Sequence, residues 1–180
     1  AAKGNIPSGE LKLVLSNKEG AFALERAKKA GIETLTLLKK DLGDAFEDRI
    51  IDELKSRNIE IIVLAGFMSI LSEKFTKTFE NRIINVHPSL IPSFCGKGFY
   101  GLHVHEAALE SGVKVTGATV HFVTAVCDGG PIILQKAVEI ENNDTPETLQ
   151  KRVMEQAEWK ILPQAVSLFC EDRITIKNNK

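Results

Sequence analysis

Short apolar runs alternate along the first half of the chain with longer stretches whose apolar residues recur every three or four positions. The runs predict β-strands and the longer stretches predict amphipathic α-helices, because a helix brings every third or fourth side chain to one face. Strands that alternate with helices indicate right-handed crossovers and an open parallel sheet. The expected strands span residues 11–16, 34–38, 61–65 and 83–86, and the expected helices span residues 21–29, 45–56 and 72–78.

Two of these helices have a clear inward stripe, and one strand has no polar side. The run at residues 61–65 is continuously apolar, as expected of a strand that is covered on both faces. The expected inward residues are Phe22, Leu24 and Ala27 in the first helix and Phe46, Ile50 and Leu54 in the second.

The second half of the chain changes to a hairpin pattern. A helix over residues 103–110 precedes two strands, 114–123 and 132–140, which are joined through Asp128-Gly129-Gly130-Pro131. Asp-Gly between two strands is a hairpin signal, so we expect an antiparallel strand pair next to the parallel strands.

A last long helix is expected to begin after Thr145. The Thr145 side chain can cap it, and Pro146 suits its first position because that position needs no N–H donor. Pro163 should kink or end this helix. The expected inward residues are Leu149, Val153, Ala157 and Ile161.

Charge and composition remove several function classes. The 180 residues carry 23 Lys and Arg against 24 Asp and Glu, so the broad basic surface of a nucleic-acid-binding protein is not expected. The longest apolar runs are too short to span a bilayer, and we expect no membrane association. The three cysteines are far apart and include no C-x-x-C pair, which favours a reducing, cytoplasmic setting without a disulfide framework or zinc site.

The strand over residues 83–86 ends in the most informative segment for chemistry. Side chains alternate along a strand, so Asn85 and His87 point to one side, and Pro88 keeps His87 out of helical geometry. An amide can donate to a developing oxyanion, and an imidazole can exchange a proton near neutral pH. The alternative is that Asn85 caps a turn and His87 is a satisfied surface group.

Asp128 strengthens the catalytic interpretation if it lies near His87. A carboxylate there would favour the imidazolium and orient the ring, but the spacing along the chain does not establish the contact. Taken alone, Asp-Gly-Gly-Pro is more often only a turn, although its glycines also allow backbone amides to approach a ligand closely.

The remaining polar residues carry weaker signals. His103 and His105, two positions apart, do not share a helix face, and no cluster at ligand spacing predicts a metal site. His121 is expected to be structural, with a place in the pocket wall as the alternative. Cys127 is expected to act as a small inert hydrophobe, and Lys97, in a glycine-rich loop, is a possible anion contact.

Several segments together resemble the folate-dependent phosphoribosylglycinamide formyltransferase family. The resemblance implies a Rossmann-like α/β fold: an open twisted, mostly parallel sheet with helices on both faces and an antiparallel strand pair in the C-terminal half. It also implies direct transfer of a formyl group from 10-formyltetrahydrofolate to the amine of glycinamide ribonucleotide, through a tetrahedral intermediate, in de novo purine biosynthesis. The matching segments are residues 16–18, 65–68, 84–92, 117–123 and 128–132.

The same resemblance implies site residues and partners. Asn85, His87 and Asp128 form the implied catalytic trio, and Glu158 aligns with a glutamate that holds the glycinamide substrate. The implied partners are the two small molecules alone, without a metal, in a cytoplasmic monomer or homodimer. The residues implied to border the folate pocket are Met68, Ser69, Ile70, Leu71, Asn85, Thr124, Ala125, Val126, Cys127 and Asp128.

The chain also departs from the family pattern. Residues 1–4 read as the last turn of a helix, so residues 1–180 are expected to be a single domain without its first strand, glycine-rich loop and most of its first helix. Because that strand is central in the family, its loss would leave a gap in the sheet. Gly43 replaces a ligand-contacting arginine, and Ser69 stands where Met-Arg is common.

Other functions use similar residues. A formyltetrahydrofolate hydrolase would use the same trio with water in place of the amine, and a folate- or nucleotide-binding module would bind without catalysis. A nicotinamide dehydrogenase is less favoured, because no G-x-G-x-x-G opens a helix in this chain.

Overall fold

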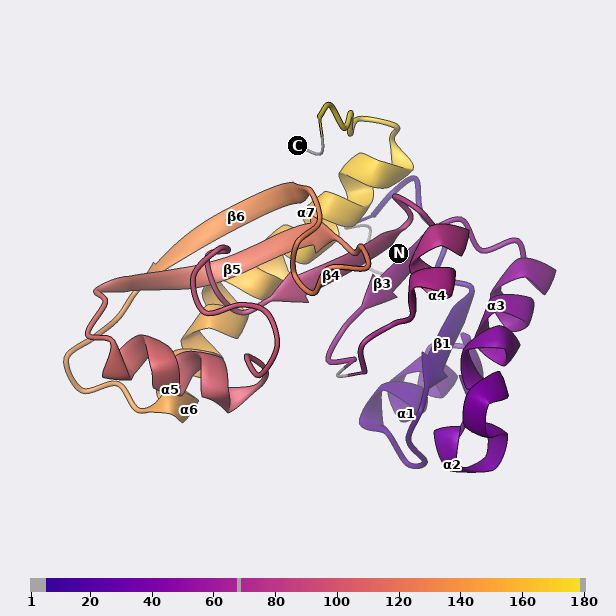
Figure 1. Cartoon of the computed structure of the whole chain (residues 1–180), viewed down its shortest axis with the longest axis horizontal. Helices are drawn as coiled ribbons and strands as arrows, with labels where there is room; N and C mark the ends of the chain where they lie inside the picture. Colours follow the sequence, from indigo (N-terminus) through magenta and orange to yellow (C-terminus); the bar gives the residue numbers. More distant parts are fainter. Residues whose placement is uncertain (1–5, 68, 179–180) are drawn as a thin grey trace. The chain divides into compact units, whose positions relative to one another are not determined.

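The computed structural model describes residues 6–67 and 69–178 and divides the chain into two compact units, Ala1–Glu60 and Ile61–Lys180 (Figure 1). The described strands form a two-stranded sheet in the first unit and a four-stranded sheet in the second. The expected gap left by a missing central strand stays a prediction.

The first unit is built on a parallel strand pair. Strands β1 (Leu13–Ser16) and β2 (Glu33–Thr36) are joined by helix α1 (Phe22–Lys29), and Leu13 lies opposite Glu33. Leu24 and Ala27 of α1 are buried as expected, but the inward placement of Phe22 is wrong, because its side chain is 69% exposed. Positions two apart on a helix differ by roughly 200° in direction, so Leu24 and Phe22 cannot face the same side.

After β2 the chain forms more helix than expected. Helix α2 (Lys39–Leu42) and a 3₁₀ turn (Gly43–Ala45) precede helix α3 (Phe46–Ser56). The predicted stripe of α3, at Phe46, Ile50 and Leu54, is confirmed as buried. The two short helical turns lack an apolar stripe, which is the signal that the hydrophobic pattern depends on.

The second unit contains the four-stranded sheet, in the order β3-β4-β5-β6. β3 pairs in parallel with β4, and the pairs β4–β5 and β5–β6 are antiparallel, which confirms the expected hairpin. The middle residue of β3, Val63, is 39% exposed, so the expected cover on both faces is wrong for this edge strand. The elements are β3 (Ile62–Leu64), α4 (Glu73–Thr78), β4 (Ile83–His87), α5 (Leu102–Glu110), β5 (Val115–Phe122) and β6 (Ile132–Glu139).

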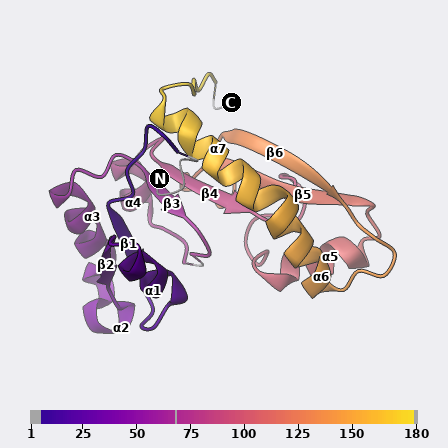
Figure 2. The ribbon, with the colours of Figure 1, turned by 180° about the vertical axis from the view of Figure 1, so that it is seen from behind.

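The last helical segment covers one face of this sheet (Figure 2). It consists of α6 (Pro146–Val153), a π-helical turn (Met154–Glu158) and α7 (Trp159–Cys170), and the Thr145 side chain caps it by accepting from the Thr148 N–H. The helix does not end at Pro163 but continues to Cys170; the irregular turn lies before the proline instead. The inward stripe is confirmed, since Leu149, Val153, Ala157 and Ile161 are all buried against the sheet.

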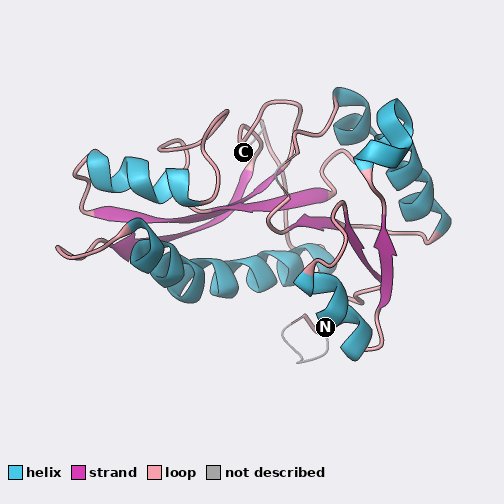
Figure 3. Cartoon of the chain, turned by 90° about the horizontal axis from the view of Figure 1, so that it is seen from below, coloured by secondary structure: helices cyan, strands magenta, loops and turns pink. Residues whose placement is uncertain are grey.

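The two faces of the sheet differ in character. Figure 3 shows α6 and α7 on one side of the strands and α5 on the other, which places helices on both faces. On β4, Ile84 belongs to the apolar core beneath α6 and α7, so its neighbours Asn85 and His87 face the opposite side. The apolar core of the second unit therefore packs against one face of β4, and the polar residues of β4 lie on its other face.

Candidate active site

The register between β4 and β5 determines which side chains meet on the polar face. Asn85 lies opposite His121, and His87 lies opposite Thr119, in an antiparallel ladder. Directly opposed residues project to the same face, so the two strands together present an amide, two imidazoles and a hydroxyl there. Both imidazoles are buried, with His87 4% and His121 1% exposed.

The chain after β4 is fixed against the same face. The Thr119 hydroxyl donates to the Ser89 carbonyl at 2.7 Å and accepts from the Ile91 N–H at 3.0 Å. Gln135 donates to the Ile91 carbonyl at 3.0 Å and to the Thr119 hydroxyl at 2.9 Å. Because these bonds fix the turn that follows His87, the end of β4 has one defined geometry.

His87 has different partners at its two ring nitrogens. Its Nε2 lies 2.8 Å from the Phe94 carbonyl, which can only accept, so Nε2 carries a hydrogen. Its Nδ1 lies 3.7 Å from Oδ2 of Asp128. The nitrogen left to take up a proton is therefore Nδ1, and a proton there would face a carboxylate.

Asp128 lies on the turn between β5 and β6, with a backbone φ of 53°. Its Oδ2 accepts from the Gly96 N–H at 2.8 Å, and its Oδ1 lies 3.6 Å from Nε2 of His121. Burial alone would raise the pKa of Asp128, but the contacts with His121, Gly96 and His87 outweigh burial and lower the pKa to about 2. The carboxylate is therefore charged throughout the neutral range.

The two glycines after Asp128 allow its turn to pack directly on the end of β5. A Cβ at Gly130 would lie 1.9 Å from the Phe122 carbonyl oxygen, so no side chain fits there. The Phe122 N–H donates to the Pro131 carbonyl at 2.9 Å, and the Gly129 N–H donates to the Val126 carbonyl at 3.1 Å. These contacts hold Asp128 over the histidines.

The structure thus brings Asn85, His87 and Asp128 together on one face. The residue that the sequence pattern undervalued is His121, which joins two of them: Nδ2 of Asn85 lies 3.3 Å from its Nε2. This contact could have been predicted once the strand register was known. Polar residues alternate along both strands, and the register places His121 of β5 opposite Asn85 of β4 and Thr119 opposite His87.

The segments expected to border a folate pocket are mostly exposed. Met68 lies outside the described residues. Ser69 and Ile70 are exposed, Ile70 at 69%, whereas Leu71 is buried in the core. In the second segment Ala125, Val126 and Cys127 are exposed, Val126 at 67%, and the Thr124 hydroxyl bonds to the backbone of Val126. Cys127 is an exposed free cysteine, and its expected inertness stays a prediction.

Glu158 lies on the π-helical turn, where burial raises the pKa of its carboxyl to about 7. Within the described part of the chain, no hydrogen bond or ion pair connects it to Asn85, His87 or Asp128. Among the described residues this carboxyl has no compensating cation, so it is suited to bind a donor from a ligand.

His103 and His105 point in different directions from their helix, as expected. His103 is exposed and pairs with Glu106 at 2.9 Å, whereas His105 is fully buried, so they do not share a helix face. Burial, and after it the charge of His87, lowers the pKa of His105 to about 4, which leaves it neutral beside the site. Among residues 6–67 and 69–178, no group of His, Cys, Asp or Glu is arranged to hold a metal ion.

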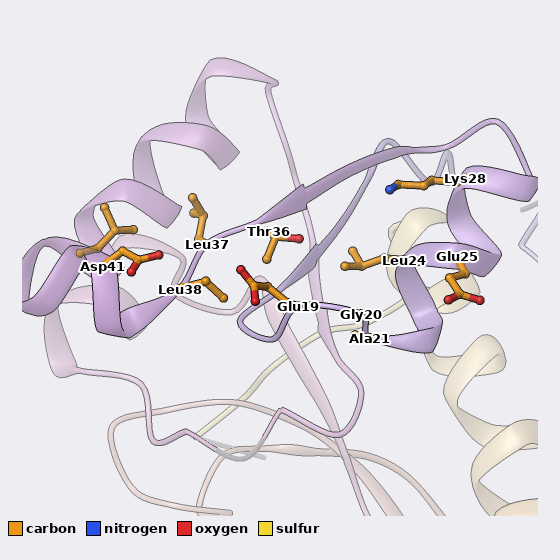
Figure 4. A pocket seen from close by; sticks show the side chains of 11 residues that line it. Glu19, Gly20, Ala21, Leu24, Glu25, Lys28, Thr36, Leu37, Leu38 and Asp41 are labelled. Atoms are coloured by element: carbon orange, nitrogen blue, oxygen red, sulfur yellow. The ribbon is translucent and has the colours of Figure 1, made fainter.

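A separate hollow of about 590 Å³ lies within the first unit (Figure 4). It is bordered by apolar Leu24 and Leu38 and by the charged side chains of Glu25, Lys28 and Asp41. Its lining contains none of the three converging residues, so it is not the site described above. No described helix is long and apolar enough to cross a membrane.

The α/β fold and the site formed by Asn85, His87 and Asp128 are those expected of formyltransferases, and comparison with known proteins agrees with this class. Residues 1–166 match the formyl transferase family, and the chain belongs to that family. It is 41% identical to phosphoribosylglycinamide formyltransferase of Escherichia coli, over 99% of this chain and 82% of that protein. The crystal structure of glycinamide ribonucleotide transformylase 1 from Symbiobacterium toebii superposes with a TM-score of 0.91 at 40% identity, covering 99% of this chain and 82% of that one.

A hydrolytic relative is more distant. A formyltetrahydrofolate deformylase from Pseudomonas syringae superposes with a TM-score of 0.80 at 25% identity, covering 95% of this chain and 55% of that one. The fold is therefore shared with a protein named as a deformylase, while the sequence identity is higher to the proteins named as formyltransferases.

Proposed function

We propose that this chain transfers a formyl group from 10-formyltetrahydrofolate to the amine of glycinamide ribonucleotide, a step of de novo purine biosynthesis. The observation that carries the proposal is the convergence of Asn85, His87 and Asp128 at the end of β4. An amide, a buried imidazole and a carboxylate on one face can stabilise an oxyanion and move a proton without a metal. The 41% identity to a protein named for this reaction supports the same assignment.

The reduced folate supplies the formyl group, and the amine attacks its carbon to give a tetrahedral intermediate. The new C–N bond forms first; the intermediate then collapses with cleavage of the bond to the folate nitrogen, and one proton passes from the amine to that nitrogen. Asn85 donates an amide hydrogen to the oxygen of the intermediate. His87, protonated at Nδ1 beside Asp128, stabilises the negative charge and takes part in the proton transfer.

One contact must change for His87 to act directly. Its Nε2–H is donated to the Phe94 carbonyl, so the formyl oxygen has to replace that carbonyl as the acceptor. Asp128 needs no change, because its carboxylate is already charged and held by Gly96. Its role is to favour the imidazolium and to fix the ring.

The binding residues belong to the proposal as well. The exposed aliphatic side chains of Ile70 and Val126 are suited to cover the apolar faces of a pteridine, in segments that also include Met68, Ser69, Leu71 and Thr124 to Asp128. Glu158 is proposed to hold the glycinamide substrate through a group other than the attacking amine, because its desolvated carboxyl, with a raised pKa, gains from a hydrogen-bond donor. We also propose a cytoplasmic monomer or homodimer that acts on these small molecules and binds no nucleic acid.

Substitution of the reacting residues tests the proposal. We expect Asn85→Ala and His87→Ala each to lower kcat at least about a hundredfold, because loss of one oxyanion donor costs roughly 3 kcal/mol. Asn142→Ala and His103→Ala, which remove the same groups from exposed positions, serve as controls and should leave kcat within about twofold. Circular dichroism and thermal melting check that the variants fold. Near-native kcat in a folded Asn85 or His87 variant would contradict the assignment.

Product analysis separates transfer from hydrolysis. With 10-formyltetrahydrofolate as donor, formylated glycinamide ribonucleotide should appear in proportion to the folate consumed, with little free formate. Equal release of formate with and without the amine substrate would identify a hydrolase. Folate binding without consumption of the donor would identify a binding module instead.

A further inference from the structure

His121 is buried beside the site, yet the proposed reaction assigns it no role. It is the direct cross-strand neighbour of Asn85, it is 1% exposed, and its Nε2 lies 3.3 Å from Nδ2 of Asn85. The expectation that it is merely structural does not explain why its ring contacts both Asn85 and Asp128.

The backbone fixes the tautomer of this ring. Nδ1 of His121 lies 2.8 Å from the Phe122 carbonyl oxygen, and a carbonyl can only accept. Nδ1 therefore carries the hydrogen. A neutral imidazole has only one N–H, so Nε2 presents a lone pair and can only accept.

An acceptor at Nε2 selects one orientation of the Asn85 amide. The amide has a donating end and an accepting end of nearly equal size, and only the donating end forms a hydrogen bond with a lone pair. In the reversed orientation the amide oxygen would face that lone pair without a bond. The second nearby group, Oδ1 of Asp128, lies 3.6 Å from Nε2, farther than Nδ2 of Asn85 at 3.3 Å, so Asn85 is the nearer partner of Nε2.

We propose that His121 is a positioning residue, which acts through Asn85 by holding its NH₂ group, rather than its carbonyl oxygen, toward the reacting centre. One amide hydrogen is bound by His121, and the second hydrogen on the same nitrogen is left for the oxygen of the intermediate. The inference rests on the proposed function, because it assumes that Asn85 is the oxyanion donor. The hydrogen-bond chain runs from the Asn85 amide through the His121 ring to the Phe122 carbonyl.

A double-mutant cycle tests whether His121 acts through Asn85. Formyl transfer by the intact protein is measured for the parent, His121→Phe, Asn85→Ala and the double variant. We expect His121→Phe to lower kcat roughly 10- to 100-fold in the parent, with KM for glycinamide ribonucleotide within twofold, and to lower it less than twofold in the Asn85→Ala protein. An equal loss of kcat in both backgrounds would overturn the inference.

A buried histidine elsewhere provides the matched control. His105 is fully buried on α5 and forms no hydrogen bond within the described part of the structure, so His105→Phe removes the same group without touching Asn85. Its effect on kcat should be the same in both backgrounds. His121→Gln, which places an amide oxygen near the former Nε2, should recover part of the kcat lost in His121→Phe; recovery of stability without recovery of kcat would count against positioning.

A measurement on the unsubstituted protein does not depend on the folding of any variant. The ¹⁵N shifts of the His121 ring should show a neutral ring with the hydrogen on Nδ1, and the hydrogen on Nε2 would overturn the inference. The two failures are distinguishable. A parent protein that transfers no formyl group contradicts the proposed function, whereas an active parent with an additive cycle contradicts only the role of His121.

Discussion

Two carboxyl groups in the second unit occupy opposite environments. Asp128 lies on the turn between β5 and β6, where Gly96 and the two histidines lower its pKa to about 2. Glu158 lies on the π-helical turn between α6 and α7, where burial raises its pKa to about 7. The same chemical group therefore carries a permanent charge in one place and gains a charge readily only with a partner in the other.

The difference in pKa indicates that Asp128 and Glu158 have different roles. A carboxylate that is already solvated by protein donors costs no reorganisation when an imidazolium forms beside it, which suits a group that supports catalysis. A desolvated carboxyl without a partner is destabilised when it ionises, and a hydrogen-bond donor of a bound substrate relieves that cost. We infer that Asp128 acts on the enzyme's own histidine and that Glu158 acts on the substrate.

The largest effect is expected when the permanent charge is removed. Asp128→Asn keeps the size of the side chain and an acceptor for the Gly96 N–H, but it no longer favours the His87 imidazolium. We expect kcat to fall about 10²–10⁴-fold, the usual range for lost acid–base assistance. Steady-state formyl transfer at saturating substrate measures this.

Asp172→Asn is the control for that substitution. Asp172 is an exposed aspartate with the same backbone φ of 53°, so it reports any cost of placing Asn in this conformation. It should leave kcat unchanged within about twofold. A similar loss in both variants would mean that the backbone, not the charge at Asp128, explains the result.

The position of Asp128, and with it the lowered pKa of its carboxyl, also depends on Gly130. In Gly130→Ala the new Cβ would lie 1.9 Å from the Phe122 carbonyl oxygen, so the turn that carries Asp128 must move. We expect the free energy of unfolding to fall by about 1–3 kcal/mol, as for an overpacked site, and kcat to fall with it. Chemical denaturation measures the stability.

Gly129→Ala tests whether the loss of stability in Gly130→Ala comes from its contact with the backbone of Phe122. A Cβ at Gly129 would lie 2.6 Å from Cγ1 and 2.9 Å from Cβ of Val126, so Val126 must shift, but it is exposed and is not part of a strand. Its cost should be clearly smaller than that of Gly130→Ala. Equal costs would show that the backbone contact at Phe122 does not determine the turn.

How far the sequence predicts this arrangement depends on the range of the interaction. Asn85 and His87 could be placed on one face because alternation along a strand is local, and the buried stripe of α3 follows from local periodicity. The approach of Asp128 to His87 depends on the β4–β5 register and on the turn after β5, which no local pattern determines. Only the family resemblance pointed to that contact.

The failures have the same origin. Phe22 is apolar but lies on the helix face away from Leu24, and helix α2 has no apolar stripe from which it could be predicted. Val63 on β3 is apolar yet 39% exposed, because apolar sequence alone does not show whether a strand face is covered. The importance of His121 appears only after the register is known, since its partner Asn85 is on another strand.

The smallest expected effect is that of substituting Glu158, and it follows from the raised pKa of that carboxyl. In the folded protein Glu158 keeps its proton up to about pH 7, whereas the unfolded chain loses it near 4.5, so stability falls as the pH rises between these values. Glu158→Gln removes this dependence. Its unfolding free energy should match that of the parent near pH 4 and exceed it by about 1–2 kcal/mol at pH 8, less than a fully enclosed group would give.

Denaturant unfolding at the two pH values measures the difference, and Glu155→Gln, one turn earlier and exposed, should show none. Asp128 cannot mimic the effect, because its lowered pKa changes stability only between about pH 2 and 4, where stability rises with pH. If Glu158→Gln is no more stable than the parent at pH 8, the carboxyl is not held in a desolvated state. The proposal that it is kept to hold the substrate then loses its physical basis, even if KM for glycinamide ribonucleotide rises in the variant.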